Sequence, residues 1–140
     1  MRATRSGATL IELSLVLAVA GIATGITVPR IRTTVDRLAL RGAVQDVRLA
    51  FAVARDQAVR RGDYVSVVAD STGRVRVVSN SDVLFARDVA RGRGATLSAT
   101  RDSVTYAPTG LGWGAANTTV IVRRGTRADT IVVSRLGRVR

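Results

Sequence analysis

Glu12 is the first residue whose type and position raise a chemical question. It lies near the start of an apolar run, "ATLIELSLVLAVAGIATGITV", residues 8–28, that contains no other ionisable side chain. As a helix rising 1.5 Å per residue, the run would span about 32 Å, close to the hydrocarbon thickness of a bilayer. A carboxylate inside a bilayer costs about 3 kcal/mol on insertion scales. We therefore expect Glu12 to have a positively charged partner.

Two simpler interpretations of the apolar run compete with a paired acid. A cleaved secretory signal would have a basic start, at Arg2 and Arg5, and a small-residue cleavage site at Ala18–Ala20. The acid and the continuation of apolar sequence to Val28 argue against it. In a plain membrane anchor, Glu12 would be a cost without a purpose. The arginines on the two sides of the run are balanced, so flanking charge does not fix its orientation.

A second chemistry is suggested by the arginines near the C-terminus. The net charge is +12, and every basic residue is an arginine. Alternation along an extended tail would place Arg138 and Arg140 on the same side, and Gly137 would let the backbone approach a phosphate. The planar guanidinium suits bidentate phosphate contacts. The candidate DNA-binding residues are Arg124, Arg127, Arg135, Gly137, Arg138 and Arg140. The alternative is a solvated end, or arginines that pair with acids of neighbouring subunits.

Several function classes are disfavoured by residues that are missing. The chain has no cysteine and no histidine, and Glu12 is its one glutamate. Disulfides and thiolate metal sites are therefore excluded, as is the commonest general base. We find no nucleophile–base pair, so we expect no enzyme, no metal site and no cofactor.

No segment resembles a helix that reads base edges in a DNA groove, so any DNA contact would be independent of sequence. Trp113, in a glycine-rich loop, is expected to be a lid on the sheet; the alternative is an exposed contact residue.

The pattern along the chain predicts an α+β fold. Apolar residues recur at three- and four-residue steps from Leu40 to Ala58, which predicts one long helix from Ala8 to about Arg61, stopped by Gly62. From Tyr64 the period changes to two. A hairpin with Gly73 in its turn comes first, and "RGTRAD" joins the last two strands. The further strands expected are Val83–Ala86, Thr96–Ala99, Val104–Tyr106, Thr118–Arg123 and Thr130–Arg135. Glycines 92, 94, 110, 112 and 114 mark loops. The long helix is expected to pack on an antiparallel β-sheet.

Gly7 followed by "ATLIE", the long apolar helix and Pro29 resemble the class III signal of type IV prepilins and pseudopilins. The resemblance implies that a prepilin peptidase removes residues 1–7 and methylates the new N-terminus at Ala8. Glu12 would then be the fifth residue of the mature chain. In a filament it could neutralise the Ala8 amine of a neighbouring subunit, a pair worth a few kcal/mol at about 4 Å. Four residues apart on one helix, the two groups could also pair within one chain.

Three further segments resemble the GspH/FimT group of minor pilins and pseudopilins: "ARDQAVRRG" (54–62), "YAPTGLG" (106–112) and "SRLGRVR" (134–140). The resemblance implies a structural subunit of a type II secretion pseudopilus or a type IV pilus. Its partners would be other subunits, the peptidase and the inner membrane, where one pass would precede a periplasmic domain and, later, a filament. The expected organisation is a leader (1–7), a transmembrane and filament-core helix (8–28), its amphipathic continuation (29–62) and a sheet domain (63–140). Gly137-Arg138-Val139-Arg140 matches the motif of DNA-binding minor pilins, so DNA uptake is the alternative function.

Overall fold

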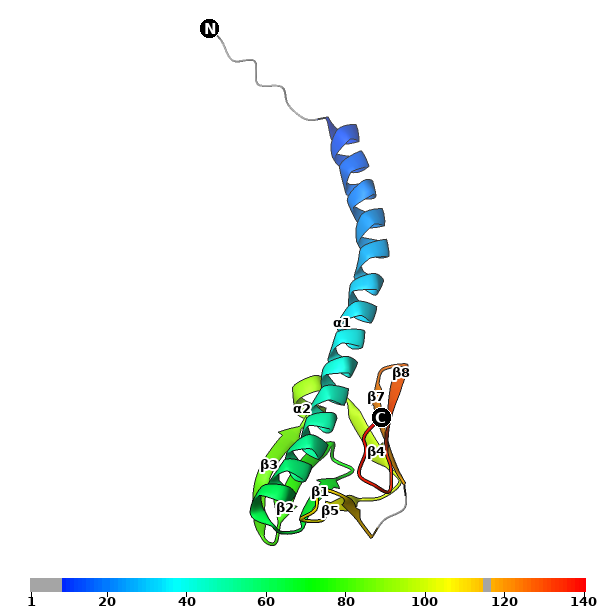
Figure 1. Cartoon of the computed structure of the whole chain (residues 1–140). Helices are drawn as coiled ribbons and strands as arrows, with labels where there is room; N and C mark the ends of the chain where they lie inside the picture. The colour runs from blue at the N-terminus through cyan, green and yellow to red at the C-terminus, as the bar shows by residue number, and fades with distance from the viewer. Residues whose placement is uncertain (1–8, 115–116) are drawn as a thin grey trace. The chain divides into compact units, whose positions relative to one another are not determined.

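The computed structural model describes residues 9–114 and 117–140, with the helical backbone alone for residues 26–30. Its first element is α1 (Leu10–Arg61), a helix of 52 residues (Figure 1). The expected stop is confirmed, because α1 ends at Arg61 and Gly62 follows with φ +63°. A left-handed backbone at this place suits glycine, which has no Cβ to clash.

Five antiparallel strands form the first sheet, in the order β3-β2-β1-β5-β6. The expected hairpin is confirmed: β1 and β2 pair with Val67 opposite Val77, and Gly73 in the turn has φ +83°. Asp70 Oδ1 accepts hydrogen bonds from the backbone amides of Thr72 and Arg74, which holds the turn. The strands are β1 (Val65–Ala69), β2 (Arg74–Ser79), β3 (Asp82–Asp88), β5 (Ser103–Tyr106) and β6 (Gly112–Trp113).

A second sheet contains β4 (Thr96–Ala99), β7 (Thr118–Arg124) and β8 (Arg127–Val133), in the order β4-β7-β8. The antiparallel β-structure is therefore divided into two sheets rather than one. The expected strand Thr130–Arg135 is wrong at both ends, because β8 begins three residues earlier and ends two earlier. The β7–β8 turn is also tighter than "RGTRAD": Arg124 pairs directly with Arg127, and the turn residue Gly125 has φ +56°.

One short helix differs from the sequence-based expectation. α2 (Val89–Arg93) lies between β3 and β4, where Gly92 and Gly94 suggest a loop. The Asp88 side chain caps its first turn by accepting a hydrogen bond from the Arg91 amide at 2.8 Å. Gly94, with φ +60°, ends it. Asp88 before the helix and Gly94 after it are the local signals for this helix in the sequence.

Both sheets and the second part of α1 contribute to one hydrophobic core. The helix supplies the stripe expected from its spacing, with Val47, Phe51 and Ala54 buried. The largest fully buried side chain is Tyr106, on β5. In Figure 1, strands of both sheets lie around the last turns of α1. The core members are Leu40, Ala43, Val44, Val47, Ala50, Phe51, Ala54, Ala58, Val65, Val67, Val75, Val77, Val89, Ala95, Leu97, Val104, Tyr106, Val120, Val122, Ile131 and Val133.

The chain divides into two compact units, residues 1–35 and 36–140. Every core residue belongs to the second unit, which we call the head. In the described part of the first unit, the large apolar side chains from Leu10 to Ile22 are exposed, Leu10 to 87%. Across the described residues, no helix combines the length and the apolar character needed to cross a membrane.

A candidate anion-binding groove beside the C-terminal tail

The C-terminal segment, residues 134–140, is docked on the head rather than free. After β8 it reverses through a tight turn, in which Gly137 N–H donates to Ser134 O at 2.8 Å. It then pairs with β8: Val132 N–H donates to Arg140 O at 3.0 Å, and Arg140 N–H donates to Val132 O at 2.9 Å. We call this segment the tail. Its order comes from sheet-like hydrogen bonds, so its side chains have defined directions.

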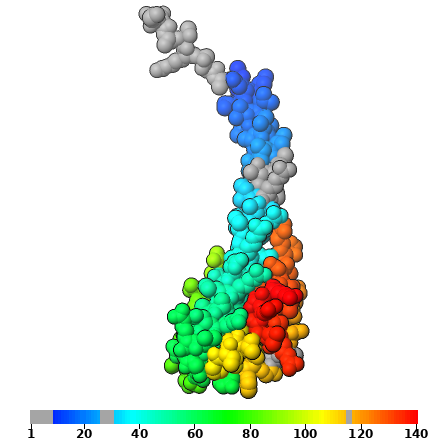
Figure 2. All heavy atoms as spheres, in the orientation of Figure 1, coloured from blue at the N-terminus to red at the C-terminus, as the bar shows by residue number. Residues whose placement is uncertain are grey.

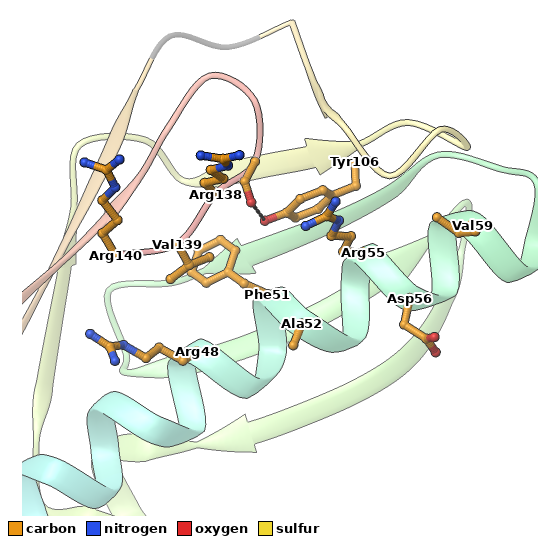
Figure 3. Close-up of a pocket in the computed structure, with 11 residues that line it drawn as sticks. Arg48, Phe51, Ala52, Arg55, Asp56, Val59, Tyr106, Arg138, Val139 and Arg140 are labelled. Atoms are coloured by element: carbon orange, nitrogen blue, oxygen red, sulfur yellow. Dashed lines mark hydrogen bonds between the residues drawn. The ribbon is translucent and has the colours of Figure 1, made fainter.

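Alternation along the tail is as the sequence indicates. Arg138 and Arg140 are exposed, whereas Val139 between them is half-buried and packs against the core. Figure 3 shows Val139 pointing toward Phe51 on α1, while Arg138 and Arg140 point away from the helix. Both arginines are therefore exposed on the side of the tail opposite to the Val139 side chain, and their guanidinium groups are available to an anion.

Tyr106 and Gly137 fasten the tail to the first sheet. The Tyr106 hydroxyl donates to Gly137 O at 3.1 Å, a buried hydrogen bond that Figure 3 marks. A Cβ on Gly137 would lie 2.5 Å from Tyr106 Cε1, and its φ is +79°. Burial raises the pKa of Tyr106 to about 12, against a smaller lowering by the Arg55 charge. Gly137 is thus a turn and packing residue, a role that the sequence alone does not assign to it.

A groove of about 680 Å³ runs between α1 and the tail. We call it the tail groove. Figure 2 shows the tail, in red, lying against the head part of α1 on the face drawn. The groove is lined by Arg48, Phe51, Ala52, Arg55, Asp56, Val59, Tyr106, Gly137, Arg138, Val139 and Arg140. Four of these are arginines, and its one acid, Asp56, is 2.8 Å from Arg60 Nε. The groove therefore combines a cationic lining with apolar side chains.

Segments that are far apart in the sequence meet at this groove. The loop of residues 107–111 closes on itself, with Ala107 N–H donating to Leu111 O at 2.8 Å. A Cβ on Gly110 would lie 3.0 Å from Val59 Cγ2 and 3.4 Å from Arg55 Nε, so the loop packs on the end of α1. A Cβ on Gly112 would lie 2.6 Å from Arg135 O, so the next residues pack on the tail turn. The three head segments of the family resemblance are thus brought together.

The structure separates the predicted DNA-binding residues into two groups. Arg135, Gly137, Arg138 and Arg140 belong to the tail. Arg124 and Arg127 flank the turn at the other end of β8, about 20 Å away for a strand of this length. Arg124 is already engaged, because its Nε lies 2.8 Å from Asp36 Oδ1 and its Nη1 donates to Arg93 O. Arg127 lies beside Arg37 and Arg41 in a separate, smaller hollow.

Arg48 and Arg55 are groove residues that the sequence does not single out. The helical pattern places them on the polar side of α1, where solvated arginines are ordinary. A spacing of seven residues puts them on one helical face, and that spacing is the available signal. The sequence gives no indication that the tail lies beside them.

At the N-terminus, the structure adds a role for Thr9. Its Oγ1 accepts a hydrogen bond from the Glu12 amide at 3.2 Å, and α1 begins at the next residue, Leu10. Thr9 and Glu12 therefore have the spacing of a capping box. Gly7 and Ala8, the expected cleavage and methylation site, lie outside the described residues.

Trp113 is not the expected lid. It lies on the edge strand β6 and is 58% exposed. Its ring packs edge-on against Tyr64, with centroids 5.2 Å apart. Within residues 9–114 and 117–140, no three acidic side chains gather where they could hold a metal ion.

Comparison with known proteins identifies the family. The model of "Type II transport protein GspH" matches residues 43–137, more than half of the chain. The fold is similar to two crystal structures of the type IV minor pilin FimU of Pseudomonas aeruginosa. The first has a TM-score of 0.63 at 17% identity over 74% of this chain and 88% of that one. The second has a TM-score of 0.59 at 16% identity, over 71% and 90%. No curated protein matches the sequence. The match over most of the head, with a long N-terminal helix on antiparallel sheets, shows that the chain belongs to the GspH family and has a type IV pilin-like fold.

Proposed function

We propose that this protein is a minor pilin or pseudopilin that assembles into a type IV pilus or a type II secretion pseudopilus. Membership of the GspH family supports a structural role in such a filament. The observation that carries the assembly role is the exposure of the apolar side chains of α1 between Leu10 and Ile22. Exposed apolar surface of this extent on a helix calls for a cover, either lipid or the helices of other subunits.

In this proposal, the inner membrane holds residues 8–28 before assembly, with the head in the periplasm. Prepilin peptidase cuts between Gly7 and Ala8, and the Ala8 amine is methylated. The Glu12 carboxylate then pairs with the Ala8 amine of a neighbouring subunit as the filament grows. The intact mass of the mature protein tests the first steps: it should lack residues 1–7 and carry one additional methyl group.

Substitutions at Glu12 and Thr9 distinguish charge pairing from helix capping. Glu12→Gln keeps a residue that suits a capping box but removes the charge, so it should prevent incorporation into filaments. Thr9→Ala removes the cap at a cost of about 1 kcal/mol to helix stability and should still permit incorporation. Filaments sheared from cells and probed for this subunit give the readout. Normal incorporation of Glu12→Gln would contradict the pairing role.

DNA binding by the tail is the second candidate function. It is supported by Arg138 and Arg140, which are exposed on the same side of an ordered segment. The proposed contact is with phosphates and independent of sequence. For the full chain in non-ionic detergent, the logarithm of affinity for duplex DNA should fall with the logarithm of salt at about −0.9 per phosphate neutralised. Replacing both arginines with glutamine should make that slope shallower by about two. An unchanged slope would exclude the tail as the site.

A further inference from the structure

We propose that the tail groove binds an acidic peptide segment with an apolar anchor, supplied by a different subunit of the filament. This rests on the proposed function in one respect, since the partner is a filament subunit. It goes beyond the tail arginines, because it assigns a role to α1 residues that face the groove.

The apolar lining is the first reason to favour a peptide. Ala52 and Val59 are exposed on α1, and Val139 of the tail lies across from them in the lining. The CH groups of a sugar–phosphate backbone are small and flanked by charged phosphates, so they cover these side chains less well than the apolar side chain of a peptide. A peptide side chain that fills a hollow between charged rims is the usual anchor of a protein interface. The volume, about 680 Å³, is in the range of pockets that enclose a compact ligand.

The arginines of α1 determine which peptide residues should flank the apolar anchor. Arg48 and Arg55 are both exposed, and seven residues place them about 10.5 Å apart along the helix axis. The Gly110 loop packs beside Arg55, since a Cβ on Gly110 would lie 3.4 Å from Arg55 Nε. Because Asp56 pairs with Arg60, it leaves Arg48 and Arg55 available to bind an anion from another molecule. An extended peptide with acids at its first and fifth positions carries both on one side, about 13 Å apart, with an apolar third residue between them. The long arginine side chains can absorb the difference.

The net charge argues for a different subunit rather than a second copy. The full chain carries +12, and the loss of Arg2 and Arg5 with the leader still leaves +10, so two copies repel each other at close range. An acidic segment of another subunit would instead reduce the local charge. Neighbours of opposite charge also associate faster and in a defined orientation.

The test uses the full chain in non-ionic detergent and a fluorescein-labelled peptide, Glu-Ser-Phe-Ser-Glu, with blocked ends. One control peptide has glycine in place of phenylalanine, another has glutamine in place of both glutamates, and a short oligothymidylate represents nucleic acid. The protein variants are Arg48→Gln, Arg55→Gln and Ala52→Glu, which introduces an acid on the exposed side of the helix. Arg101→Gln is the matched control, because Arg101 is exposed and does not line the groove.

We expect the phenylalanine peptide to bind at least tenfold more tightly than either control peptide. Arg48→Gln and Arg55→Gln should each weaken it about fivefold, Ala52→Glu should weaken it more, and Arg101→Gln should have no effect. Equal binding of all three peptides, or an equal effect of Arg101→Gln, would overturn the proposal in favour of general attraction to a cationic surface. The proposal would be overturned in favour of nucleic acid if the peptide does not bind, while the oligothymidylate binds and the groove variants weaken its binding. The peptide assay does not depend on filament formation, so its failure is distinct from a failure of the proposed assembly role.

Discussion

Gly137 shows how a residue that suggests phosphate binding can serve packing first. Its left-handed backbone and its contact with the Tyr106 ring leave no room for a side chain. Gly137→Ala should therefore destabilise the head by about 2 kcal/mol, from backbone strain and a displaced tyrosine. Urea unfolding measures this effect. If the variant loses DNA or peptide binding together with stability, the loss reports on the tail fold and not on a glycine–phosphate contact.

Tyr106 predicts how the stability of the head depends on alkaline pH. Its pKa is raised to about 12 by burial, above the ordinary value of 10. The folded state therefore keeps the proton where the unfolded chain loses it. The contribution of Tyr106 to the free energy of unfolding is therefore complete below pH 10. Between pH 10 and about 12 it declines by at most about 1.4 kcal/mol per pH unit. Urea unfolding at pH 9 to 12 should show a smaller decline in Tyr106→Phe, which has no group to ionise. An identical decline would contradict the assignment to Tyr106.

At the scale of elements, two ion pairs connect the head part of α1 to the segments around it. Asp36 meets Arg124 at the end of β7 at 2.8 Å, and Asp46 meets Arg93 of α2 at 3.0 Å. Arg93 also lies across Gly42, where a Cβ would come 2.8 Å from the guanidinium. Glycine at position 42 thus leaves the space through which the Arg93 side chain reaches Asp46.

Each of these pairs should contribute modestly to stability. Because all four side chains are partly solvated, Asp36→Asn and Asp46→Asn should each lower the free energy of unfolding by about 0.5–1 kcal/mol. The effect should shrink in high salt, which screens exposed pairs. Asp56→Asn is the comparison, since its partner Arg60 is on the same exposed helical face and its loss should cost less. Equal losses for all three variants would contradict the role of the pairs between elements.

The elements that the sequence predicts well are those with a repeated local pattern. The stripe from Leu40 to Ala58 identifies the buried side of α1, and Gly62 its end. Alternation around Gly73 identifies the first hairpin. The two-residue strand β6 has too little sequence to show a period. The division into two sheets depends on pairings such as Val67 with Val104, which lie far apart in the chain and leave no local signal.

The candidate site is predicted only in part for the same reason. The alternation of Arg138, Val139 and Arg140 is visible in the sequence, and the exposed and half-buried positions agree with it. The docking of the tail on β8 and the approach of Tyr106 depend on long-range contacts. Arg48 and Arg55 become part of a site only because of them.

At the scale of the whole molecule, the two units differ in what stabilises them. All the buried core residues belong to the head, whereas the described apolar side chains of residues 9–25 are exposed. A fragment of residues 36–140 should therefore fold alone, remain soluble without detergent and unfold in one cooperative transition. Its melting temperature should be within a few degrees of the transition of the full chain in detergent, by circular dichroism. A broad, non-cooperative transition would show that the head depends on the preceding residues.

The pairing of Arg140 with Val132 also affects how the tail can be studied by deletion. Removing the last residues would take away two arginines, but it would also expose unpaired backbone N–H and C=O groups along the edge of β8. Exposed strand edges pair with strands of other molecules, through strand exchange or amyloid-like stacking. A shortened protein would thus be prone to self-association for reasons unrelated to its charge. By covering the edge of β8, the tail prevents such pairing between molecules.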